Sequence, residues 1–107
     1  MTDFNEREAA FETKYARDEE MMFRVTARRN KLVGMWAAEK MGLTPAEAAP
    51  YATSVVQADF EEAGDEDVVR KIVGDLTAAG IETDSAAVHA VLAEKSVEAR
   101  RQLMESQ

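Results

Sequence analysis

The fold class is decided by residues 64–76, which read GDEDVVRKIVGDL. Apolar residues recur there at positions i, i+3, i+4 and i+7, and they are Val69, Ile72, Val73 and Leu76. This spacing gives a helix one apolar face, because an α-helix repeats about every 3.6 residues. Asp65 is placed to cap the amides of the first turn, and Gly80 predicts the end of the helix.

The preceding residues predict a second helix that opens with Thr44-Pro45-Ala46-Glu47. Threonine and glutamate at this spacing form a capping box, and proline suits the first helical position. Pro50 lies too deep for the first turn, so we expect it either to kink this helix or to restart it after a short turn. The residues expected to face inward are Tyr51, Ala52, Val55 and Phe60.

A longer helix is predicted upstream, over residues 18–41, and Gly42 is suited to end it. Its apolar stripe consists of Met21, Met22, Val25, Leu32, Val33, Met35 and Trp36. Trp36 is the only tryptophan, and we expect it at the centre of the core, packed against Phe60 and residues 72–76.

The last helix is predicted to begin at a cap formed by Thr83 or Asp84. Its inward residues are expected to be Val88, Val91, Leu92, Ala99 and Leu103. No stretch alternates apolar and polar residues over the length of a strand, and no internal repeat is present. The sequence therefore predicts an all-α protein in which residues 18–107 form a four-helix bundle.

Composition excludes several classes of protein. The chain has 107 residues, no cysteine and a net charge of −8, with 13 basic against 21 acidic residues. These values exclude a disulfide framework and a thiolate zinc site, and they disfavour nucleic acid as a partner. We find no signal peptide and no apolar run long enough to span a membrane, so we expect a cytoplasmic protein that is not embedded in a membrane.

The residues needed for catalysis are missing as well. His89 is the only histidine, so no catalytic triad or multi-histidine metal site can form, and we expect it on the surface. The five glycines are isolated, which excludes a glycine-rich phosphate loop. We therefore predict no catalytic residue, no metal, no cofactor and no enzymatic activity.

Residues 1–17, called the arm below, differ from the rest of the chain. Phe4, Phe11 and Tyr15 fall on one narrow line among charged residues, at spacings of seven and four. This strip can form a helix but is too narrow to be buried in its own domain. Two interpretations remain open: a frayed extension of the first helix, or a flexible arm that becomes helical when it binds a partner.

A basic cluster follows in the first helix. Arg24, Arg28 and Lys31 lie at helical spacings of four and three and share one face. This face is either a salt-bridged surface or a weak anion site that binds ATP or ADP, since guanidinium groups suit phosphate oxygens.

Four strings of sequence resemble one family. They are FETKYARDEE at residues 11–20, ARRNKL at 27–32, GMWAAEKMGL at 34–43 and ADFEEAGDEDV at 58–68. The family is the zeta subunit of alphaproteobacteria, a natural inhibitor of the F-type ATP synthase. The resemblance covers nearly the whole chain and keeps the order and spacing of the strings.

This resemblance implies a four-helix fold whose N-terminal region inhibits ATP hydrolysis. That region is expected to become helical and to wedge between a catalytic alpha–beta pair and the gamma rotor of the ATP synthase head. On this mapping Phe4, Phe11 and Tyr15 are apolar anchors. The arm's basic residues, which would pair with carboxylates of the enzyme, are Arg7, Lys14 and Arg17. The protein would then lie in the cytoplasm, peripheral to the inner membrane through the ATP synthase.

Overall fold

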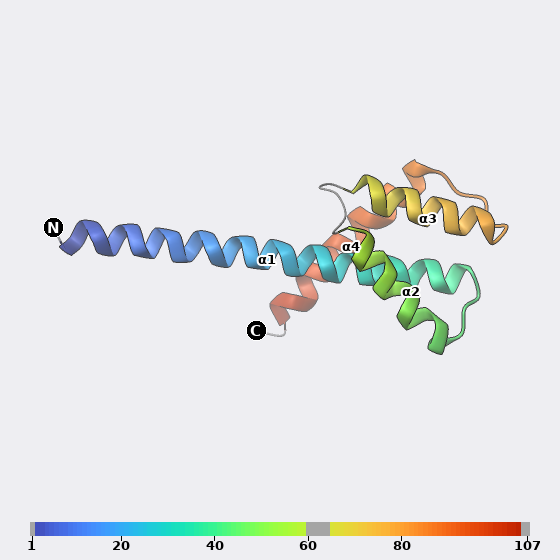
Figure 1. The fold of residues 1–107 in the computed structure, drawn as a ribbon, viewed down its shortest axis with the longest axis horizontal. Helices are drawn as coiled ribbons and strands as arrows, with labels where there is room; N and C mark the ends of the chain where they lie inside the picture. Colours follow the sequence, from blue (N-terminus) through green and yellow to red (C-terminus); the bar gives the residue numbers. More distant parts are fainter. Residues whose placement is uncertain (1, 60–64, 106–107) are drawn as a thin grey trace.

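The structure, a computed structural model, describes the backbone of residues 2–59 and 65–105 and the side chains of residues 19–59 and 65–105. Within these residues the chain is four helices and no strand, which confirms the all-α prediction. The helices are α1 (Thr2–Lys40), α2 (Pro45–Ala58), α3 (Glu66–Ala78) and α4 (Ser85–Glu105). Figure 1 shows α2, α3 and α4 gathered around the C-terminal half of α1, whose N-terminal half projects alone.

The boundaries of α2 follow the sequence signals. The capping box is present: the Glu47 amide donates to the Thr44 hydroxyl at 3.3 Å, and the Thr44 amide donates to the Glu47 carboxylate at 3.0 Å. The Thr44 amide and the Thr44 hydroxyl both donate to the Glu47 carboxylate, which stabilises its ionised form and lowers the pKa of Glu47. Pro50 lies inside α2, which continues to Ala58, so the expected alternative of a restart is wrong. Pro50 is exposed, and because it has no amide proton the helix lacks one hydrogen bond at this position.

Of the N-terminal caps predicted for α3 and α4, the one for α4 is confirmed and the one for α3 is wrong. Asp84 caps α4, because its carboxylate accepts the Ala87 amide at 2.8 Å. Asp65 precedes α3 as predicted but makes no side-chain cap. Its carboxylate instead lies 2.8 Å from the Arg29 guanidinium, a charged partner that outcompetes the neutral amides. Gly42 and Gly80 follow α1 and α3 with φ of 71° and 83°, the left-handed conformation expected of them.

The core forms where α1 packs against the three other helices. Val69, Ile72 and Leu76 are buried and Val73 is half-buried, as the spacing predicts. The core residues are Val33, Ala37, Val55, Val68, Val69, Ile72, Leu76, Val88 and Leu92. Most are small or β-branched, so the helices approach each other closely.

The closest approach is the crossing of α1 and α2 at Gly34. A Cβ atom added there would lie 2.7 Å from the Ala52 Cα, closer than real atoms pack. Ala37, Ala38 and Ala52 are also buried beside this crossing. Glycine and alanine therefore set the distance between these two helices.

Trp36 does not occupy the centre predicted for it. It is half-buried at the edge of the core and lines an open groove together with Met35, Leu43 and Lys95. The ammonium of Lys40 lies 5.9 Å from the centre of its ring. Val33 and Ala37, both fully buried, hold the inward positions of this part of α1, so the indole of Trp36 lies at the flank of the buried face. Phe60, its expected partner, lies outside the described residues.

The predicted apolar stripe of the first helix also begins too early. Met22 is 68% exposed, and Val25 is the first buried residue among the described part of α1. The N-terminal half of α1 projects from the bundle in Figure 1, and Met22 and Phe23, upstream of Val25, stay exposed. Within the described residues no helix is both long and apolar enough to cross a membrane.

Candidate functional site

The projecting half of α1 is the most conspicuous feature of the fold. The helix runs from Thr2 to Lys40 without interruption, so its backbone is continuous across the expected boundary at Asp18. The molecule measures 65 Å along its long axis but only 26 and 21 Å across. A projecting helix of this kind can reach into a groove that the bundle is too wide to enter.

The candidate partner-binding residues all lie on this projecting helix. The side chains of Phe4, Arg7, Phe11, Lys14, Tyr15 and Arg17 lie outside the described residues. Their backbone is helical, so the spacings of seven and four place positions 4, 11 and 15 on one side of α1. Their role as anchors stays a prediction.

The junction between arm and bundle, residues 19–24, carries two exposed apolar residues that were not predicted as site residues from the sequence. Met22 and Phe23 are both large, exposed side chains. Glu20 and Arg24 form an ion pair at 2.6 Å across one turn, which supports the helix of the junction. The sequence signal was present in the spacing from Tyr15 to Met22, but Met22 was assigned to the core stripe.

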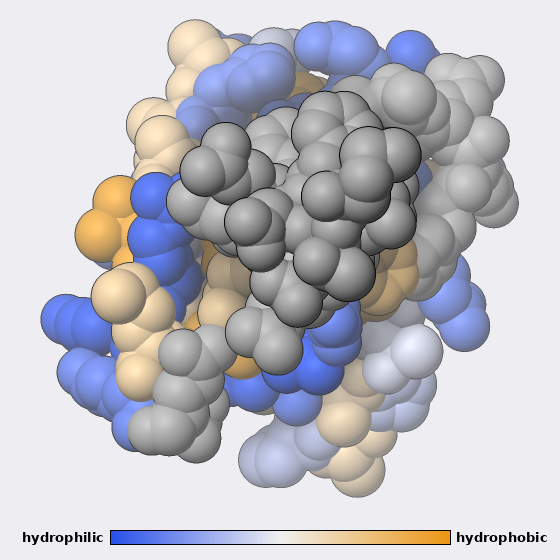
Figure 2. Space-filling view, turned by 90° about the vertical axis from the view of Figure 1, so that its left-hand side faces the viewer, coloured by the Kyte–Doolittle hydropathy of each residue, from blue (hydrophilic) through white to orange (hydrophobic). Residues whose placement is uncertain are grey.

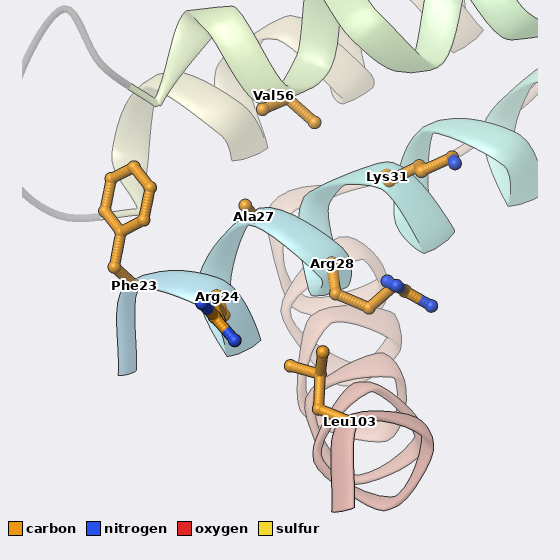
Figure 3. Close-up of a pocket in the computed structure, with 7 residues that line it drawn as sticks. All are labelled: Phe23, Arg24, Ala27, Arg28, Lys31, Val56 and Leu103. Carbon is orange, nitrogen blue, oxygen red and sulfur yellow. The ribbon is translucent and has the colours of Figure 1, made fainter. Parts of the chain in front are cut away.

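The basic cluster lines a groove of about 440 Å³ beside this junction. Figure 3 shows Arg24, Arg28 and Lys31 on α1, Val56 on α2 and Leu103 on α4. Phe23 and Ala27 complete the lining. The structure therefore brings the three predicted cations to one groove, as their spacing suggested, and adds an apolar wall from distant parts of the chain.

The charges of this groove are only partly available to a ligand. Arg24 is paired with Glu20, and Arg28 donates a hydrogen bond to the Gln102 side chain at 3.0 Å. The charged end of Arg24 lies well apart from those of Arg28 and Lys31 in Figure 3. An anion held by all three cations would require these side chains to move. Seen from the end at which α1 projects, the described surface mixes hydrophilic and apolar side chains (Figure 2).

Arg29, which is adjacent to Arg28 in the sequence, makes structural contacts and does not line the groove. Its side chain is only 11% exposed, and its guanidinium contacts both Asp65 at 2.8 Å and the Asn30 side chain at 2.9 Å. Asn30 is itself buried. This network ties α1 to the start of α3 and satisfies the buried polar groups, so Arg29 is not available for a ligand.

None of the histidine and acidic residues that the structure describes form a group that could hold a metal ion. His89 is exposed as expected, with its Nε2 atom 4.0 Å from a Glu66 carboxylate oxygen. Burial and the neighbouring Asp75 carboxylate raise the pKa of Tyr51, whose hydroxyl donates to Asp75 at 2.7 Å. This hydrogen bond joins α2 to α3 and keeps the phenol neutral.

Comparison with known proteins identifies a family and a similar solved structure. The family described as ATPase inhibitor subunit zeta matches residues 1–102. A structure solved by NMR in solution is 47% identical and superposes with a TM-score of 0.72, over 81% of this chain and 99% of that chain. No curated protein matches the chain.

Proposed function

The chain belongs to the ATPase inhibitor subunit zeta family, and we propose that it blocks ATP hydrolysis by inserting its N-terminal helix into the F-type ATP synthase. The site of insertion would be a catalytic alpha–beta interface facing the gamma rotor. An inhibitor subunit acts by binding, which agrees with the expected absence of enzymatic activity. Its working location would be the cytoplasm, peripheral to the inner membrane through the ATP synthase.

One observation carries this proposal: α1 extends far beyond the bundle that should anchor it. Residues 2–24 precede the first buried residue described in α1. At about 1.5 Å per residue, this part of the helix is roughly 35 Å long. A helix of that length and about 10 Å width can occupy a cleft between subunits, where it would obstruct rotation of the neighbouring shaft.

The chemistry of the arm supports the same mechanism. In the proposed complex Phe4, Phe11 and Tyr15 enter apolar pockets, where aromatic side chains contribute most of the binding energy. Basic residues of the arm would pair with carboxylates at the rim, and they are Arg7, Lys14 and Arg17. The functional division is then residues 1–17 as the inhibitory arm and residues 18–107 as the bundle domain.

A double substitution in the arm tests this proposal. Phe11→Asp combined with Tyr15→Asp should weaken inhibition by about a hundredfold or more, because two charges would enter an apolar groove. The measurement is ATP hydrolysis by the purified ATP synthase head as the inhibitor is titrated. As a control, Arg100→Glu with Arg101→Glu changes two exposed charges on α4 and should leave inhibition within about twofold. Equal loss in both variants would contradict a role for the arm.

A second candidate function is weak nucleotide binding at the groove of Arg24, Arg28 and Lys31. The observation that favours it is that all three cations line one groove, with Phe23 beside them. Their existing partners and the net charge of −8 oppose tight binding of a nucleotide.

Titration with ADP tests the nucleotide site. We expect saturable NMR shifts clustered at Arg24, Arg28 and Lys31, at concentrations between micromolar and millimolar, and Arg28→Glu should abolish them. Shifts spread over all basic residues, or removed by modest salt, would indicate non-specific ion pairing and would exclude the site.

A further inference from the structure

We propose that the surface that contacts the ATP synthase head extends beyond the arm to Met22, which acts as a further apolar anchor. This inference rests on the proposed function, because it places Met22 in the same cleft as the arm. The partner is the apolar wall of that cleft, contacted further along the same helix.

The first argument is exposure. Met22 is 68% exposed although methionine is apolar, and it lies in the junction between the arm and the bundle. Every described residue from 19 to 24 is exposed or half-buried, and burial begins only at Val25. Met22 and the adjacent Phe23, which is 56% exposed, form a contiguous exposed apolar pair, and contiguous exposed apolar surface is typical of a contact with another protein.

The second argument is register. Positions 4, 11, 15 and 22 are separated by seven, four and seven residues, and α1 is one continuous helix over all of them. These separations correspond to two turns, one turn and two turns, so the four positions lie along one side of the helix. Met22 therefore continues the row formed by the three aromatic positions of the arm.

The third argument is the ion pair on the other side of the junction. Glu20 and Arg24 lie two residues before and two residues after Met22, which places both about 200° round the helix from it. This ion pair therefore lies on the side of the junction opposite Met22, while Glu19 lies about 60° from Met22. A groove that receives the aromatic row would meet Met22 and leave the Glu20–Arg24 pair on the opposite side of the helix.

The fourth argument is the stiffness of the junction. Met22 lies five residues beyond Arg17, which corresponds to about 7.5 Å along the helix axis. Neither glycine nor proline interrupts residues 2–33, so the sequence offers no hinge between the arm and the bundle. When the arm is fully inserted, Met22 must stand at the mouth of the cleft.

Two variants of nearly equal helix propensity test the inference in the full chain. Met22→Gln keeps the length of the side chain but makes it polar, and it should raise the concentration for half-inhibition of ATP hydrolysis about tenfold. Met22→Leu keeps an apolar side chain and should stay within about twofold of the unchanged protein. Met104→Gln is the matched control, because Met104 is 64% exposed on α4, and it should have no effect.

The outcomes separate this inference from the proposed function. If Met22→Gln inhibits as well as the unchanged protein while Phe11→Asp with Tyr15→Asp does not, the contact ends within the arm and the inference is wrong. If neither change affects inhibition, the proposed function itself fails. If Met22→Gln weakens self-association of the chain but leaves inhibition unchanged, Met22 belongs to a contact between two copies of the chain. This result would also overturn the inference.

Discussion

A chain that lacks residues 1–17 should no longer inhibit ATP hydrolysis, and its bundle should melt at nearly the same temperature as that of the full chain. The first buried residue described in α1 is Val25, eight positions beyond the deletion, so the deletion removes none of the described core contacts. Thermal unfolding followed by circular dichroism should shift by no more than about 2 °C. Inhibition in the hydrolysis assay should fall below detection.

The deletion is informative because the melting temperature and the inhibition of ATP hydrolysis are measured on the same chain. A large drop in melting temperature would show that the arm packs on the bundle, and loss of inhibition would then reflect unfolding. A deleted chain that still inhibits fully would transfer the inhibitory surface to the bundle. Either result would contradict the division between residues 1–17 and residues 18–107.

Gly34→Ala should be the most destabilising of the small substitutions in the bundle. The added Cβ would lie 2.7 Å from the Ala52 backbone, so α1 and α2 must move apart along a buried crossing. Overpacking of this kind costs about 1–3 kcal/mol. For a domain of about this size each kcal/mol lowers the melting temperature by roughly 4–8 °C.

Gly74→Ala is the matched control for this effect. Gly74 lies within α3, is exposed, and has no atom within 4 Å of the position of an added Cβ. Alanine there should stabilise the protein by about 0.5–1 kcal/mol, because it restricts the unfolded chain without steric conflict. If Gly34→Ala proves as stable as Gly74→Ala in thermal melts, the helices do not approach as closely as the structure shows.

Local signals in the sequence predicted the helices well. The spacing of Val69, Ile72 and Leu76 gave the buried face of α3, and Thr44 with Glu47 gave the start of α2. Both signals act within one or two helical turns, so they do not depend on how the helices are arranged.

The arrangement of the helices was harder to predict, because it depends on distant contacts. Periodicity identified a face that contains Trp36 but did not reveal that Val33 and Ala37 hold its buried centre while Trp36 lies at its edge. Asp65 was expected to cap its own helix, yet its carboxylate binds Arg29, 36 positions earlier in the chain. In the same way, periodicity alone could not show that α1 leaves the bundle before Val25.

The candidate sites also depend on contacts between residues that are distant in the sequence, which local patterns do not reveal. The spacing of Arg24, Arg28 and Lys31 predicted a shared face, but their apolar neighbours Val56 and Leu103 come from α2 and α4. The sequence also did not reveal that Arg28 is already bound to Gln102. Long-range partners such as these decide whether a cationic face is free to bind a ligand.

The central claim, that the arm enters the ATP synthase head, is tested most directly by cross-linking in the assembled complex. A photoreactive amino acid placed at Phe11 in the full chain should cross-link to the alpha, beta or gamma subunit on illumination. The same group placed at Val97, an exposed position on α4, serves as the control for the bundle surface. The account predicts efficient cross-links from position 11 that map to an alpha–beta interface beside gamma. Cross-links from position 97 alone, with none from position 11, would contradict it.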